Sequence, residues 1–69
     1  MILFTTDYTM LDTNNYKKIF VAGNKLVFES FNDRQTLTCE DEEQAKFFFE
    51  GMKAAIKRGD EFFDCEVQF

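Results

Sequence analysis

Apolar and polar residues alternate with a period close to two in several short stretches of the chain, which is typical of strands with one buried face. Residues 2–8, 16–22 and 25–31 are rich in aromatic and β-branched side chains, and a shorter run follows at 35–39. Gly23 and Asn24 tolerate positive φ and predict a tight hairpin between the second and third stretches. The short polar residues at 11–15 and 32–34 predict the other turns. We therefore expect an antiparallel meander of four strands.

The pattern changes to helical spacing after residue 40. Apolar residues fall on one helical stripe at Ala45, Phe48, Phe49, Met52, Ala55 and Ile56. Asp41 and Gln44 have the spacing of a capping box, and Glu42 and Glu43 follow where the helix dipole favours negative charge. Gly59 is well placed as the left-handed residue after the last turn. These signals predict a helix that begins after Asp41 and ends near Arg58.

Strict alternation returns from Glu61 onward and predicts a last strand. The residues expected to face inward are Phe63, Cys65, Val67 and Phe69, and those expected to face outward are Phe62, Asp64, Glu66 and Gln68. The predicted order is ββββαβ, an α+β fold in which an amphipathic helix packs on an antiparallel sheet of about five strands. Residues 1–69 are expected to form a single domain, since a chain of this length has room for one core.

Composition removes several classes of protein. The 69 residues include 13 Asp and Glu against 8 Lys and Arg, a net charge of −5, which opposes direct binding of DNA or RNA through a basic surface. The ten Phe are too many for a disordered acidic tail. No apolar run approaches the ~20 residues that cross a bilayer, and the first residues do not form a signal peptide. A soluble cytoplasmic protein without a membrane partner is expected.

Residues for catalysis or cofactor binding are scarce. The chain has no His, the side chain most used in acid–base and nucleophilic catalysis, so we expect no enzymatic activity. Cys39, just before the helix, is the one candidate nucleophile, but the acidic residues at 40–43 oppose a thiolate. We expect Cys39 and Cys65 to be reduced, packed thiols. Two cysteines cannot build a zinc site and no calcium loop is present, so no metal or cofactor is expected.

Two features point to an interaction surface. Phe47 and Phe62 fall off the core faces of their elements, and Phe20 or Phe31 does so too if the sheet is covered on one face only. The alternative is that the N-terminal segment around Met10 and Leu11 covers the second face. Acidic residues also gather at 40–43 and 60–66, at the two ends of a helix about 25 Å long. Such charges can steer a protein toward a basic groove.

The leading hypothesis is a non-enzymatic interaction protein that occludes a basic, nucleic-acid-binding surface of a protein partner. In size and acidity the chain is similar to small accessory proteins of bacteria, phages and mobile elements, including inhibitors of restriction and CRISPR systems. The residues expected to bind the partner are Glu42, Glu43, Asp60, Asp64, Glu66, Phe47 and Phe62. The alternative is a homo-oligomer, such as a homodimer, with the off-face aromatics at its interface and charge serving only solubility.

Overall fold

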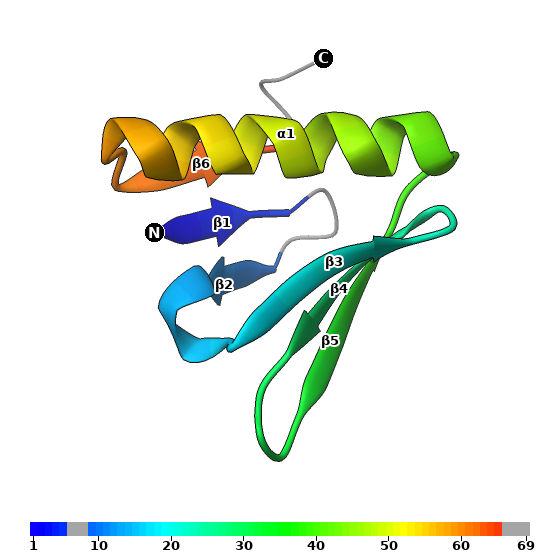
Figure 1. The fold of residues 1–69 in the computed structure, drawn as a ribbon, viewed down its shortest axis with the longest axis horizontal. Coiled ribbons are helices and arrows are strands. Elements are labelled where there is room, and N and C mark those ends of the chain that lie inside the picture. Colours follow the sequence, from blue (N-terminus) through cyan, green and yellow to red (C-terminus); the bar gives the residue numbers. More distant parts are fainter. Residues whose placement is uncertain (6–8, 66–69) are drawn as a thin grey trace.

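A computed structural model of the chain describes residues 1–5 and 9–65. The described residues form β1 (Ile2–Phe4), β2 (Met10–Asp12), the 3₁₀ turn η1 (Thr13–Asn15), β3 (Lys18–Ala22), β4 (Lys25–Glu29), β5 (Arg34–Thr38), α1 (Glu42–Arg58) and β6 (Phe62–Asp64). The strands make two three-stranded sheets, in the orders β2-β1-β6 and β3-β4-β5, and α1 runs along one side of both (Figure 1). The predicted α+β class is confirmed.

The β3-β4-β5 sheet is the predicted antiparallel meander. Ala22 pairs with Lys25 across the Gly23-Asn24 turn, and Gly23 has a φ of +61°, which confirms the hairpin. Asn24 also holds the chain that leads into the helix. Its carbonyl accepts the backbone N–H of Cys39 at 2.8 Å, and its side-chain amide donates to the Cys39 carbonyl at 3.0 Å. The hairpin tip therefore fixes where α1 begins.

The first strand does not join this meander, which corrects the expectation of one sheet. β1 pairs antiparallel with β2 and parallel with β6, with Leu3 opposite both Leu11 and Phe63. Leu11 and Asp12 were expected to belong to a turn and instead form β2 together with Met10, because pairing with β1 brings Leu11 onto the core. The turn forms just afterwards, where Asp12 Oδ1 accepts the N–H of Asn14 at 3.0 Å. The predicted extension of the first strand over 6–8 lies outside the described residues.

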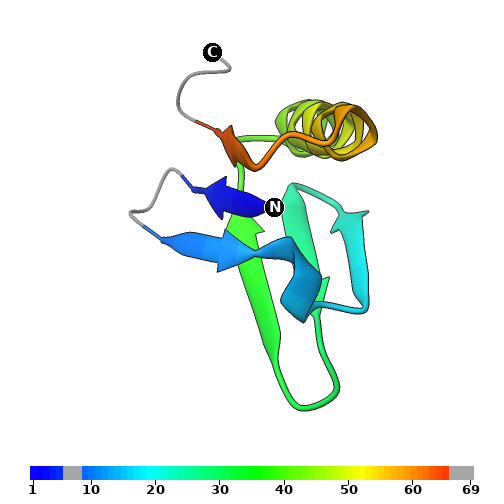
Figure 2. The same ribbon diagram turned by 90° about the vertical axis from the view of Figure 1, so that its left-hand side faces the viewer.

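The helix begins and ends where the sequence predicts. Asp41 Oδ1 accepts the N–H of Gln44 at 2.8 Å, and Gln44 Oε1 accepts the N–H of Glu40 at 2.7 Å. At the other end Gly59 has a φ of +81°, and its N–H bonds the carbonyls of Ala55 and Ile56. Figure 2 shows α1 end-on above the two sheets. Both ends are capped by local interactions, so the helix bounds follow from the sequence alone.

One core joins the helix to both sheets. Its buried side chains are Leu3, Leu26, Phe28, Leu37, Cys39, Ala45, Phe48, Met52, Ala55, Phe63 and Cys65. Phe63 and Cys65, expected to face inward, are buried, and so is Cys39, expected to be a packed thiol. The other two expected inward positions, Val67 and Phe69, lie outside the described residues. The helical stripe is buried only in part, because Phe49 is half-buried and Ile56 is 51% exposed. These two residues lie beside β3, the last strand of its sheet, and no described strand lies beyond β3 to cover them.

The glycine in the middle of α1 marks the closest approach between the helix and β6. A Cβ at Gly51 would lie 2.7 Å from the tip of the Phe63 ring, well inside van der Waals contact. Phe63 is itself buried and has little room to move aside. Glycine costs a helix interior about 1 kcal/mol relative to alanine. Here that cost lets the aromatic ring pack directly on the helix backbone.

Candidate protein-interaction surface

The face of the β2-β1-β6 sheet that points away from the core gathers exposed apolar side chains. Leu3 faces the core, so Ile2 and Phe4 on either side of it face outward. Strand register places Asp12 and Phe62 beside Ile2, and Met10 and Asp64 beside Phe4. We call these six residues the outer sheet face: Ile2, Phe4, Met10, Asp12, Phe62 and Asp64.

The apolar part of the outer sheet face is continuous and accessible. The rings of Phe4 and Phe62 meet edge to face with their centroids 6.0 Å apart. Met10 is 69% exposed and Phe62 is 62% exposed. Together with Ile2 and Phe4 they line a shallow hollow of about 550 Å³. Exposed apolar clusters of this kind, rimmed by polar residues, are typical of interaction sites.

Carboxylates rim this cluster. Asp12 and Asp64 stand at diagonally opposite corners of the outer sheet face, and Glu61 lines the same hollow. The terminal amine lies 3.8 Å from Asp12, and Arg58 lies 2.7 Å from Asp60, so two of the nearby carboxylates have cationic neighbours. With Asp64 and Glu61 the rim carries more carboxylates than cations, and this charge favours a basic partner.

The structure brings some of the predicted binding residues together and separates others. Asp60, Phe62 and Asp64 line one depression beside Gly51 and Arg58. Glu42, Glu43 and Phe47 lie at the opposite end of α1 (Figure 1), where Glu42 pairs with Lys46 at 2.8 Å. Glu66 lies outside the described residues. The six described residues of this set therefore divide between two separate surfaces.

The expectation that Phe47 and Phe62 lie off the core is confirmed by the exposure of both rings. Phe31 is also exposed, and Phe20 is half-buried with Lys18 Nζ 4.8 Å from its ring centre. Sequence reasoning missed Met10 as a binding residue, because it was considered only as part of an N-terminal segment that covers the second face of the sheet. The shared face of Ile2 and Phe4 was visible as a period of two, but their exposure depended on which neighbours they paired with.

The two thiols do not have the environment of a nucleophile. Cys39 and Cys65 are both buried and unbridged. Burial and the nearby Asp41 carboxylate raise the pKa of Cys39. Burial, followed by repulsion from Cys39 and Asp64, raises the pKa of Cys65 to about 12. A reactive cysteine needs the opposite shift, so the environment of both thiols is that of core side chains.

Stability is expected to fall at alkaline pH because of Cys65. The unfolded thiol loses its proton at a pKa of about 8.5, whereas the folded thiol keeps it up to about 12. The folded state therefore binds more protons between these values, so stability is full below the unfolded pKa and decreases as pH rises toward 12. Urea midpoints measured from pH 7.5 to 10.5 should fall more steeply for the wild type than for Cys65→Ala. Parallel curves would contradict this prediction.

Neither a metal site nor a membrane span is found in the part of the chain that the structure describes. No three His, Cys, Asp or Glu side chains of residues 1–5 and 9–65 are placed to share a metal ion. Over the same residues no helix is long and apolar enough to cross a bilayer. Comparison with protein-family models, curated proteins and solved structures finds no match.

Proposed function

We propose that this chain is a non-catalytic, cytoplasmic protein-interaction module that covers a basic surface of a partner protein with its outer sheet face. The observation that carries the proposal is the apolar cluster of Phe62, Phe4, Met10 and Ile2 with carboxylates around it. Interfaces of this type combine aromatic anchors at the centre with a charged rim. A basic groove that normally binds nucleic acid is the partner surface whose charge fits best.

The acidic rim disfavours self-association through the same face. A two-fold contact between two outer sheet faces would bring Asp12 and Asp64 of both copies into one interface, on a protein whose net charge is already −5. Like charges at an interface oppose binding. A partner of the opposite charge removes this repulsion and adds attraction at longer range.

The proposal is tested by capturing partners from host lysate at about 50 mM salt and challenging them at about 500 mM, where surface charges are strongly screened. Phe62→Ala should lower the retained partner by at least tenfold, because central aromatic anchors contribute about 2 kcal/mol or more. Phe31→Ala is the control, since it removes a ring that is even more exposed than that of Phe62 from another surface. Glu61→Lys should weaken capture at low salt, while Glu50→Lys on the exposed side of α1 should not.

Three outcomes would contradict the outer sheet face as the docking surface. Capture could be equally sensitive to Phe31→Ala, or it could depend on Phe47→Ala and Glu43→Lys at the other end of the helix. A molar mass that doubles with concentration, and returns to the monomer in Phe62→Ala, would instead assign this face to a homodimer. Circular dichroism of each variant checks that the fold is retained.

A further inference from the structure

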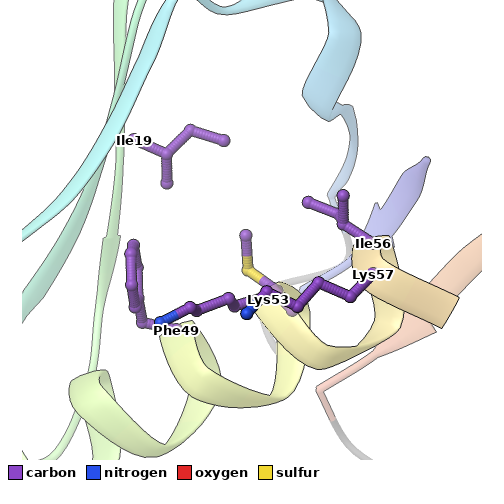
Figure 3. Close-up of a pocket in the computed structure, with 6 residues that line it drawn as sticks. Ile19, Phe49, Lys53, Ile56 and Lys57 are labelled. Carbon is purple, nitrogen blue, oxygen red and sulfur yellow. The ribbon is translucent and has the colours of Figure 1, made fainter.

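A second surface of opposite charge lies between α1 and β3. Ile19 projects from β3 toward the helix and faces Phe49 and Ile56 across an open groove (Figure 3). Met52 forms part of the wall, and the groove has a volume of about 320 Å³. Small-ligand and side-chain pockets start near 300 Å³. The groove can therefore receive an apolar side chain from outside.

One wall of this groove is the free edge of a sheet. β3 pairs with β4 alone among the described strands, so the backbone groups along its other side have no strand partner there. Figure 2 shows β3 at one side of the molecule and the β2-β1-β6 sheet at the other. An extended chain can add to such an edge through main-chain hydrogen bonds, while its alternate side chains enter neighbouring pockets.

The other wall carries two lysines. Lys53 and Lys57 line the groove from α1, and no carboxylate is among the residues that line it. The ion pairs between side chains of the described residues occupy Arg34, Lys46 and Arg58, and neither Lys53 nor Lys57 takes part in one. Lys18 does not line the groove, because it precedes Ile19 in β3 and its side chain lies on the opposite face, over the Phe20 ring. On an acidic protein this concentration of unpaired cations selects an anionic occupant.

We propose that the groove between α1 and β3 binds an extended acidic segment of a partner protein, which adds to the edge of β3 as a further strand. An aliphatic side chain of the segment fills the space between Ile19, Phe49 and Ile56. Its neighbouring carboxylates meet Lys53 and Lys57. The chain would then carry two docking surfaces of opposite sign, one for a basic surface and one for an acidic strand. This second surface stands independently of the outer sheet face.

A second copy of the chain fits the groove less well than an acidic segment does. Pairing the β3 edges of two copies would bring Lys53 and Lys57 of both into one interface. The residues of β3 itself, Lys18–Ala22, include no carboxylate to meet these lysines. Charge therefore favours a foreign strand over self-pairing.

The test uses the whole protein and a short synthetic peptide in which glutamate alternates with leucine. Binding is followed by fluorescence anisotropy and by amide chemical shifts of ¹⁵N-labelled protein. The shifts should be largest along β3 and next to Lys53 and Lys57. Lys53→Glu should weaken binding by about tenfold, the size of effect expected for a charge pair worth about 1.4 kcal/mol. Lys46→Glu is the matched control, since it makes the same charge change on α1 at a lysine that already pairs with Glu42.

Two further probes separate strand addition from general charge attraction. A peptide of the same sequence with every backbone nitrogen methylated keeps its side chains and their charges but loses all of its edge donors, and it should bind at least tenfold more weakly. Equal binding of the methylated peptide overturns the proposal, and so does equal weakening by Lys46→Glu. Tighter binding of a short oligothymidylate, or of decanoate, at the same amides would assign the groove to a nucleic acid or an amphiphile and would also overturn it.

Discussion

Phe48→Ala is expected to cost about 3–5 kcal/mol of stability, the usual loss when a fully buried ring is removed. Phe48 is 1% exposed and lies in the core that joins α1 to both sheets. A chain of this size has a total stability on the order of 3–10 kcal/mol. The expected loss is therefore comparable to the whole stability of the fold, and a large fraction of the variant should be unfolded at room temperature.

The neighbouring residue supplies the matched control. Phe47→Ala makes the same chemical change one position earlier on the helix, where the ring is 53% exposed. Its cost should stay below about 1 kcal/mol, because little buried area is lost and alanine is the better helix former. Urea titrations followed by circular dichroism compare the two variants. Equal losses would show that the helix is buried on a different face from the one described here.

Gly51→Ala is expected to destabilise the protein by about 1–3 kcal/mol, against the ordinary gain of about 1 kcal/mol for this change inside a helix. The added methyl would meet the Phe63 ring at 2.7 Å. Because the ring is held in the core, either α1 must move away from β6 or Phe63 must leave its position. Both responses also disturb the depression that holds Phe62 and Asp64.

A double-mutant cycle assigns the cause of this loss. In a Phe63→Leu background the side chain is too short to reach Gly51, so Gly51→Ala should become neutral or stabilising. Thermal or urea unfolding of the four proteins gives the coupling energy directly. A stabilising effect of Gly51→Ala in the wild-type background would contradict the close packing of α1 on β6.

The two proposed surfaces are built from different elements of the fold. The outer sheet face depends on three short strands that come from both ends of the described chain, whereas the groove depends on one hairpin strand and the helix. Their positions on different sides of the molecule allow both to be occupied at once (Figure 2). Variants at Phe62 and at Lys53 therefore test the two proposals separately.

Local signals in the sequence determined where α1 begins and ends and where the β3-β4 hairpin turns, because these bounds depend only on residues close together in the chain. Asp41, Gln44 and Gly59 set the ends of α1 through their own hydrogen bonds and positive φ, and Gly23 set the β3-β4 hairpin. Strict alternation placed Phe63 and Cys65 inward and Phe62 outward, and helical spacing placed Phe47 off the buried stripe of α1. These features need no knowledge of distant residues.

Tertiary structure decided how the strands divide into two sheets, and with them both candidate surfaces. Pairing of β1 with β6 joins residues about sixty positions apart. The hydrophobic pattern of either strand alone does not predict which strand it pairs with. Met10, considered from the sequence only as a residue that covers the sheet, became part of an exposed face through the pairing of β2 with β1, and β3 was left as an edge beside Ile56. The composition predicted an acidic protein with spare aromatic residues. Only the contacts between distant segments decided where those residues meet, because the free energy that selects a partner strand comes from packing against the whole core.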